Sequence, residues 1–184
     1  MEAIETPRLI IQQLNADHAK DVLEFYVQNQ DFLLEWEARK SEDFYTLQAQ
    51  EKLLLDDQVN FEAGKALKLW IYKKEDESRI IGCIHFSTII RSIMQSCFVG
   101  YKMDGSENGK GYITEALHAA VDLMFSKYNL HRIEAPIMPR NIASIRVVEK
   151  LGFEQDGLTK KMLLVNGVWE DHLRFSLLNP GQTC

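Results

Sequence analysis

An apolar stripe with helical spacing runs through residues 112–126 and is the most regular pattern in the chain. Its members are Ile113, Ala116, Leu117, Ala120, Val121, Met124 and Phe125. They recur every three or four positions, which is the spacing of a helix that buries one face against a sheet. The sequence therefore predicts a helix here, with its apolar face in the core.

Two further helices are predicted in the first third of the chain. One follows Asn15 or Asp17, since either side chain can cap a helix N-terminus. The other covers residues 41–63, which contain strong helix formers and no proline or glycine before Gly64. The apolar face of the first helix consists of Ala19, Val22, Leu23 and Tyr26.

Strands are predicted where the apolar period changes to two. Leu67, Leu69 and Ile71 alternate with Lys, Trp and Tyr, which is typical of a strand. A short helix over residues 141–150, ended by Gly152, is expected near the end of the chain. The expected strands are residues 8–14, 67–72, 79–89, 93–103 and 132–138.

The chain closes on a predicted hairpin. Strand patterns over residues 160–165 and 168–177 flank Asn166-Gly167, and Asn-Gly in this position is a strong hairpin signal. One face of the last strand carries Trp169, Leu173, Phe175 and Leu177. The order β-α-α-β-β-β-α-β-α-β-β predicts one α/β domain with a mixed sheet. We expect it to cover residues 1–184, with a core of about 7–179.

The composition is that of an ordinary globular protein. Of the 184 residues, 46% are hydrophobic and 26% are charged, and the net charge is −6, which argues against general nucleic-acid binding. No apolar run approaches the ~20 residues that a membrane helix needs. The N-terminus lacks the basic and apolar pattern of a signal peptide. We therefore expect a cytoplasmic protein with no membrane or nucleic-acid partner.

Cysteine and histidine give no sign of a metal site. Cys83, Cys97 and Cys184 lack metal-ligand spacing, and two of them lie in apolar, strand-like runs. The five histidines form no His-x-x-x-His pair. We expect buried, reduced thiols, no metal and no cysteine nucleophile.

A glycine-rich segment, Asn108 to Glu115, precedes the helix of the apolar stripe. Such a turn can bind an anion, because its free N–H groups point at a ligand that glycine allows to approach. An ordinary strand-to-helix turn would look the same. A dinucleotide fold would need a glycine where Thr114 stands, and a P-loop would not place Lys110 between the glycines. Both of these nucleotide alternatives fit poorly.

The segment Asn108-Gly109-Lys110-Gly111-Tyr112-Ile113, the element order, and a later Asn141-x-x-Ser144 followed by Glu149–Gly157 resemble the GNAT acetyltransferases. Within that superfamily the chain is similar to the ribosomal-protein N-terminal acetyltransferases of the RimJ/RimL type, in the branch that acts on alanine. This narrower resemblance is carried by Asp31–Arg39, by Ile81–Ser87 with Gly100-Tyr101, and by Leu163–His172.

The resemblance implies a mostly antiparallel sheet, flanked by helices, that splays apart between its fourth and fifth strands. It also implies acetyl coenzyme A as co-substrate in that opening, with the pantetheine arm along the backbone of Tyr101, Lys102 and Met103. Asn108 and Ile113 depart from the family's phosphate motif, so a side-chain contact from Asn108 is not expected by analogy. The implied pyrophosphate site consists of Asn108, Gly109, Lys110, Gly111, Tyr112, Ile113 and Thr114.

Asn141 and Ser144 lie three residues apart and share one face of the predicted short helix. The resemblance implies that Asn141 holds the pantetheine or a water, and that Ser144 is a general acid for the leaving thiolate. Asn141 could instead be only a helix cap, and Ser144 only a packed or solvated hydroxyl. Glu35, Trp36 and Glu37 could bound the acceptor site or form a packing cluster at a helix end.

No general base stands out. Leu163 occupies the place where some relatives carry a glutamate, and the remaining candidates are Glu35, Glu37, His85, Asp171 and His172. A free α-amino group has a pKa of about 8, whereas a lysine amine has a pKa near 10.4. Weak base machinery therefore favours an N-terminal amine as the acceptor.

The expected function is acetyl transfer from acetyl coenzyme A to an N-terminal α-amine of a ribosomal protein, of the alanine type. The amine would attack directly in a ternary complex, and the enzyme would be a monomer or a homodimer. Two alternatives remain open. One is acetylation of a small-molecule amine, such as a polyamine or an antibiotic, and the other is a non-catalytic protein that binds acetyl coenzyme A.

Overall fold

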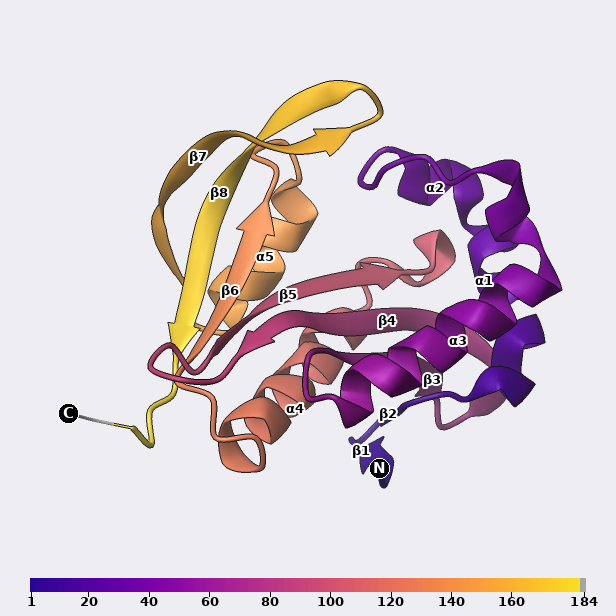
Figure 1. Ribbon diagram of the computed structural model, residues 1–184, viewed down its shortest axis with the longest axis horizontal. Coiled ribbons are helices and arrows are strands. Elements are labelled where there is room, and N and C mark those ends of the chain that lie inside the picture. Colours follow the sequence, from indigo (N-terminus) through magenta and orange to yellow (C-terminus); the bar gives the residue numbers. More distant parts are fainter. Residues whose placement is uncertain (183–184) are drawn as a thin grey trace.

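The computed structural model describes residues 1–182 and contains an eight-stranded sheet with the order β1-β2-β3-β4-β5-β6-β8-β7 (Figure 1). Strands β5 and β6 are parallel, whereas all other neighbouring strands are antiparallel. The predicted α/β class with a mixed, mostly antiparallel sheet is thus confirmed. The strands are β1 (Ile4–Glu5), β2 (Leu9–Gln12), β3 (Leu67–Lys73), β4 (Asp76–Ile90), β5 (Ser96–Met103), β6 (Arg132–Ile137), β7 (Glu154–Val165) and β8 (Val168–Leu178).

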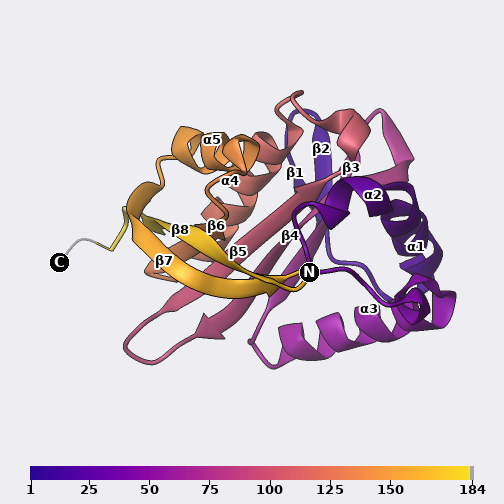
Figure 2. The same ribbon diagram turned by 90° about the horizontal axis from the view of Figure 1, so that it is seen from above.

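Helices cover both faces of the sheet (Figure 2). Helices α4 and α5 lie on one face, and α1 and α3 lie on the other. Within residues 1–182, none of the helices has the length and apolar character needed to cross a membrane. The helices are α1 (Ala19–Gln28), α2 (Gln30–Leu34), α3 (Leu47–Glu62), α4 (Tyr112–Ser126) and α5 (Ile142–Lys150).

Each face of the sheet has its own hydrophobic core. The predicted stripe of α4 lies in the larger core, where Leu117, Ala120 and Met124 are fully buried against the sheet. Ile113, at the start of the stripe, is partly buried. The second core packs α1 and α3 on the sheet around Trp70, whose ring lies 5.9 Å from that of Phe25 in an edge-to-face arrangement. Burial of the α4 face confirms the helix that the apolar spacing predicted.

Several predicted boundaries are wrong for local reasons. Helix α3 begins at Leu47 because Thr46 caps it, with Oγ1 accepting from the Ala49 N–H at 3.2 Å, and the preceding Glu42–Tyr45 is a 3₁₀ turn. Strand β5 begins at Ser96 rather than residue 93, because Ile93 lies in the turn after β4, where the residue is 98% exposed.

The first helix also differs from its prediction. It begins at Ala19, and neither Asn15 nor Asp17 caps it. The Asn15 side chain instead hydrogen-bonds the His18 ring across a 3₁₀ turn, at 2.6 Å between Oδ1 and Nδ1. Competition of this kind between local side-chain bonds and helix capping is common for asparagine.

The last hairpin is longer than predicted, since β7 begins at Glu154. Its turn does lie at Asn166-Gly167, as predicted. Phe175 is buried in the α4 core, but Trp169 is 57% exposed because it lies near the hairpin tip, beyond the core.

The sheet splays between β5 and β6, which are the fourth and fifth of the strands predicted from the sequence, so this prediction is confirmed. The two strands pair only over Ser96–Phe98 and Arg132–Glu134. Beyond that point β5 pairs with β4 alone and β6 pairs with β8 alone. Backbone groups on the facing edges of both strands are therefore left free for another partner.

Candidate active site

The glycine loop, Asn108 to Gly111, connects a 3₁₀ turn (Gly105–Glu107) to α4. Gly109 and Gly111 have φ angles of +76° and +81°, in the left-handed region that glycine adopts without steric cost. A Cβ added at Gly109 would meet no atom within 4 Å, so this side of the loop is open. The loop therefore leaves room for a ligand to approach its backbone.

The loop also leaves its hydrogen-bond donors free. Within residues 1–182, none of the backbone N–H groups from Asn108 to Thr114 donates a hydrogen bond, and α4 has no side-chain cap. Unpaired N–H groups together with the positive end of a helix dipole attract an anion. A phosphate or pyrophosphate group fits this donor set.

Charged side chains form ion pairs at the turn that precedes the loop. The Glu107 carboxylate is only 5% exposed and contacts Arg79 at 2.7 Å, Lys110 at 2.8 Å and Lys73 at 3.3 Å. The hydrogen bond from Lys110, followed by the contact with Lys73, keeps the pKa of Glu107 below its usual value despite burial. This carboxylate therefore stays ionised and fixes the turn that precedes the loop.

A residue from the other end of the chain also contacts the loop. Arg8 bonds Glu115 of α4 at 2.6 Å and the Lys110 carbonyl at 3.0 Å, and its guanidinium lies 4.5 Å from the Tyr112 ring centroid. Thr6 Oγ1 donates to the same Glu115 carboxylate at 2.6 Å. Sequence reasoning missed this group because nothing in the local sequence pairs Arg8 with a residue 107 positions away.

The second predicted catalytic segment lies at the start of α5. Asn141 caps this helix, with Oδ1 accepting from the Ser144 N–H at 3.1 Å. The Tyr101 hydroxyl donates to the Ser144 carbonyl at 2.9 Å and thus joins β5 to α5 across the splay. Among the described residues, neither Asn141 Nδ2 nor the Ser144 hydroxyl has a hydrogen-bond partner. The structure therefore supports capping by Asn141 and leaves its amide donor available.

Strand β5 directs alternate side chains to opposite faces. Tyr101 and Met103 join the α4 core, whereas Lys102 lies 5.2 Å from the ring of Tyr26 in the other core. Burial raises the pKa of the Tyr101 hydroxyl, which therefore stays protonated. The backbone is thus the part of Tyr101 and Met103 that a pantetheine arm could use.

The predicted acceptor cluster lies next to Lys102. The Glu37 carboxylate forms an ion pair with Lys102 and approaches Lys40 at 3.8 Å. Glu35 is exposed, and half-buried Trp36 lies 5.9 Å from the Arg140 guanidinium. The Glu37 carboxylate is therefore already paired with two lysines, whereas the Glu35 carboxylate is exposed and has no such partner within residues 1–182.

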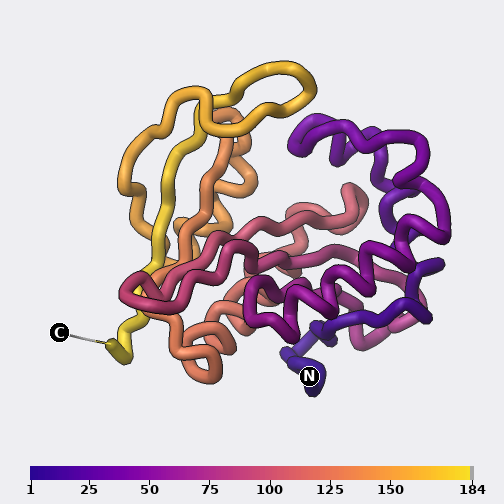
Figure 3. Tube along the Cα trace, in the orientation of Figure 1, coloured from indigo at the N-terminus to yellow at the C-terminus, as the bar shows by residue number. Residues whose placement is uncertain are grey.

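The tip of the β7–β8 hairpin extends toward the chain segment that follows α2 (Figure 3). Asn166 accepts from the Arg39 N–H at 2.7 Å and donates to the Leu34 carbonyl at 2.8 Å. Arg140, just before α5, pairs with Glu170 of β8 at 2.7 Å. The segment that carries Trp36 thus contacts both the hairpin and Arg140, which also donates to the Glu35 carbonyl at 3.4 Å.

The candidate bases are spread over the molecule. His85 is half-buried on β4, and burial followed by the charge of Lys68 lowers its pKa below 6.5, so its imidazole is neutral near pH 7. His172 is buried, with Nδ1 3.1 Å from the Glu170 carbonyl. Asp171 accepts from the Lys161 N–H at 2.8 Å. Leu163 is about half exposed on the hairpin. These contacts leave His85 as the one imidazole of the two that no hydrogen bond engages within residues 1–182.

The thiols are not placed for catalysis. Cys83 and Cys97 are buried and free, and burial raises the pKa of both, to about 12 for Cys97. They therefore remain protonated and inert. Cys184 lies outside the described residues. Within residues 1–182, no group of three His, Cys, Asp or Glu side chains is arranged to hold a metal.

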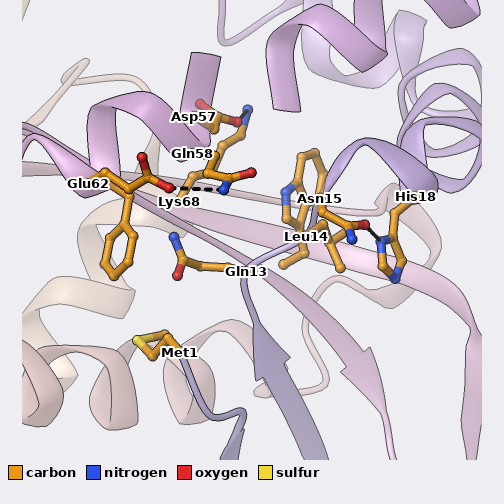
Figure 4. A pocket seen from close by; sticks show the side chains of 11 residues that line it. Met1, Gln13, Leu14, Asn15, His18, Asp57, Gln58, Glu62 and Lys68 are labelled. Carbon is orange, nitrogen blue, oxygen red and sulfur yellow. Dashed lines mark hydrogen bonds and ion pairs between the residues drawn. The ribbon is translucent and has the colours of Figure 1, made fainter. Parts of the chain in front are cut away.

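A cavity of about 380 Å³ lies elsewhere, between α3, β3 and the turn before α1 (Figure 4). Two pairs of its polar side chains contact each other: Asp57 with Lys68 at 3.2 Å, and Gln58 with Glu62 at 2.9 Å. None of the predicted site residues lines it. The cavity is thus separate from the glycine loop and from the β5–β6 opening.

Known proteins share this architecture over nearly its whole length. A family model for the acetyltransferase (GNAT) domain matches residues 8–154. A probable N-acetyltransferase of Bacillus subtilis (strain 168) is 38% identical over 172 residues, which are 94% of each chain. A ribosomal protein uS5-alanine N-acetyltransferase of Escherichia coli (strain K12) is 33% identical over 181 residues, covering 98% of this chain and 92% of the relative.

A solved structure gives the same result. The crystal structure of a ribosomal-protein-S5-alanine acetyltransferase from Vibrio fischeri superposes with a TM-score of 0.94 at 31% identity, over 100% of both chains. The splayed sheet and the open glycine loop before α4 agree with this likeness. The chain therefore belongs to the GNAT acetyltransferases, within their RimJ/RimL type.

Proposed function

We propose that this enzyme acetylates the N-terminal α-amine of a ribosomal protein, of the alanine type, in the cytoplasm. The similarity to two enzymes named for the N-terminal alanine of one ribosomal protein carries this proposal, because it extends over nearly the whole chain in both cases. The segments around Trp36 and Asn166 are part of that similarity, and they lie against each other in the fold.

The open amides from Asn108 to Thr114 are the donors we assign to the coenzyme pyrophosphate. The pantetheine arm would then follow the free edge of β5 near Tyr101, Lys102 and Met103, as an added strand does. The departures at Asn108 and Ile113 do not weaken this assignment, since the contacts come from backbone N–H groups rather than from side chains.

Acetyl coenzyme A supplies an activated acetyl thioester. The neutral acceptor amine attacks its carbonyl carbon and forms the carbon–nitrogen bond, the carbon–sulfur bond breaks, and the amine releases a proton to solvent water. We assign to the Ser144 hydroxyl the proton that the departing sulfur takes up, after which water reprotonates the serine oxygen, and to Asn141 Nδ2 a hydrogen bond to the pantetheine or a bound water. The amide donor of Asn141 is free for this because its oxygen alone serves as the helix cap.

The acceptor would enter beside Glu35, Trp36 and Glu37. Trp36 offers a wall, and Glu35 offers an exposed carboxylate to a cationic amine. Glu37 would have to exchange Lys102 or Lys40 for the incoming ammonium. No strong base is required, because an α-amine with a pKa of about 8 is already partly neutral near pH 7.

A peptide assay tests the acceptor class. Three related peptides are incubated with the enzyme and acetyl coenzyme A. One has a free N-terminal alanine, the second has the same sequence with that amine blocked, and the third is blocked and also contains a lysine. We expect thiol release and a mass gain on the free N-terminus only. Release with polyamines or aminoglycosides instead would identify a small-molecule enzyme, and stabilisation by acetyl coenzyme A with no turnover on any amine would identify a binding protein.

The cellular acceptor can be identified by mass spectrometry of protein N-termini with and without the enzyme. We expect one or a few ribosomal proteins that begin with alanine to lose N-terminal acetylation in its absence. A catalytically impaired Ser144→Ala protein, supplied in place of the normal one, is the matched control. Loss of acetylation confined to non-ribosomal N-termini would contradict the proposed substrate class.

A further inference from the structure

Arg8 has one donor group left over after it has braced the glycine loop. Its backbone N–H and its Nε bond the two oxygens of Glu115 at 3.0 and 2.6 Å. Its Nη1 donates to the Lys110 carbonyl at 3.0 Å. Within residues 1–182, Nη2 donates to no acceptor. The Arg8 side chain is 46% exposed, so a ligand can reach it.

The free Nη2 lies at the same edge of the loop as the open amides. It is 3.5 Å from the position that a Cβ would take at Gly111. Gly111 belongs to the run of residues whose N–H groups have no acceptor in the described part of the chain. A guanidinium N–H and several backbone N–H groups therefore converge on one small region, and such a set suits a phosphate oxygen.

The other cations near the loop are engaged by acidic side chains. Lys110, Arg79 and Lys73 all contact Glu107. Arg8 is also paired, with Glu115, but its planar fork has more donors than that carboxylate uses. A lysine in this place could not hold Glu115, the Lys110 carbonyl and a ligand from fixed directions at once.

We propose that Arg8 is a coenzyme-binding residue, whose Nη2 donates to a phosphate oxygen of acetyl coenzyme A and completes the anion site of the glycine loop. Glu115 is then a positioning residue, because it orients the guanidinium through Nε. This inference rests on the proposed binding of the coenzyme at the loop, and it adds a side-chain contact from the N-terminal segment to what had been a backbone site.

Calorimetric titration of the ligand-free protein with ligands that carry no acetyl group tests the contact between Arg8 and phosphate without any turnover. The ligands are coenzyme A, dephospho-coenzyme A and pantetheine, and the variants are Arg8→Gln and Arg8→Lys. Arg91→Gln, in the exposed turn after β4, is the control that makes the same change in net charge far from the loop. Loss of one charge-assisted hydrogen bond should weaken coenzyme A binding by about 10- to 100-fold in Arg8→Gln.

The expected pattern is loss of affinity for coenzyme A in both Arg8 variants, with pantetheine and the Arg91 control unchanged. If Arg8→Gln binds coenzyme A and dephospho-coenzyme A equally, the lost contact is with the 3′-phosphate; if both ligands weaken together, it is with the pyrophosphate. Either result supports the proposal. Equal weakening of pantetheine would show that Arg8 only shapes the loop, and normal affinity for coenzyme A in Arg8→Gln would overturn the proposal.

Two further measurements show whether a loss of binding comes from misfolding, from a wrong location of the coenzyme site, or from Arg8 itself. Urea unfolding of the ligand-free variants shows whether each is folded, and Arg8→Lys serves if Arg8→Gln is not. If the unmodified protein fails to bind coenzyme A, the coenzyme site itself is misassigned. If it binds, and Gly111→Asp abolishes binding while Arg8→Gln does not, the Arg8 proposal alone is wrong.

Discussion

Helices α4 and α5 begin in opposite ways. The N-terminus of α5 satisfies itself, since the Asn141 side chain accepts from Ser144 and its carbonyl accepts from Ile145. The N-terminus of α4 has no side-chain cap, and within residues 1–182 the amides from Asn108 to Thr114 donate to no acceptor. The N-terminus of α5 is therefore capped by the side chain of Asn141, whereas the amides at the start of α4 remain available to an anion.

The open terminus needs support that the capped one does not. Glu107 gathers three cations beneath the loop, and Glu115 draws Arg8 and Thr6 against the first turn of α4. At α5, among residues 1–182, the one long-range hydrogen bond to the first turn comes from Tyr101 to the Ser144 carbonyl. The comparison shows that the free N–H groups of the glycine loop are held in position by the charged contacts of Glu107 and Glu115.

Replacing Gly111 by Asp should abolish this difference and have the largest effect. Residue 111 is the N-cap of α4, so a carboxylate there would accept from the open amides and repel the coenzyme phosphates. We expect at least a 100-fold rise in the Kd for coenzyme A by calorimetry. Gly111→Asn is the matched control, because asparagine tolerates a positive φ and has the same shape without the charge. An unchanged Kd in Gly111→Asp would remove the loop from its assigned role.

Replacing Ser144 by Ala asks whether α5 contributes chemistry as well as structure. Removal of a general acid should lower kcat by about 100-fold, while the Kd for coenzyme A changes little. The measurement is steady-state turnover of an alanine-starting peptide. Ser126→Ala, at the far end of α4, is the control for loss of a hydroxyl. Full turnover in Ser144→Ala would leave the hydroxyl without a catalytic part.

Two substitutions at Asn141 separate its cap from its amide donor. Asn141→Ala removes both and should lower the free energy of unfolding by about 1 kcal/mol, measured in urea. Asn141→Asp keeps an acceptor for the Ser144 N–H and should preserve stability. If the amide binds the pantetheine, turnover should fall in both variants. Normal turnover in Asn141→Asp would reduce Asn141 to a cap.

The smallest expected effect concerns pH and the charged support under α4. Since the pKa of Glu107 is lowered on folding, its stabilising contribution is complete above its ordinary value of 4.5 and is lost as the pH falls through the lowered value. Urea unfolding between pH 7 and pH 3 should therefore show falling stability on the acid side. Glu107→Gln should flatten that dependence, and an identical pH profile for the two proteins would contradict the assignment.

The sequence predicts most elements where the pattern is long. The stripe of α4 and the Asn-Gly turn of the last hairpin are placed as predicted, because burial and turn chemistry both act locally. Two short elements, β1 with two residues and α2 with five, are missed because they are too short to show a period. Ile93 misleads for another reason: one apolar residue in a turn looks the same as one at the start of a strand.

The candidate site divides in the same way. The loop and the Asn141-x-x-Ser144 segment can be found from sequence because each is contiguous. The contacts that support them cannot, since Arg8 reaches Glu115 across 107 residues and Lys102 reaches Glu37 across 65. Even the bond from Tyr101 to the Ser144 carbonyl spans 43 residues. Such pairs depend on strand order and register, which no local pattern contains.

The pairing of Arg8 with Glu115 has a consequence for folding. The glycine loop lies near the middle of the chain, but it is braced only after the first residues of the chain have docked beside α4 through β2 and its partner β3. Contacts between such distant segments form late, because closing a long loop is entropically costly. Coenzyme binding should therefore appear with the final step of refolding, as a property of the assembled chain. An isolated peptide with the sequence of residues 108–115 would contain the motif but would lack the brace.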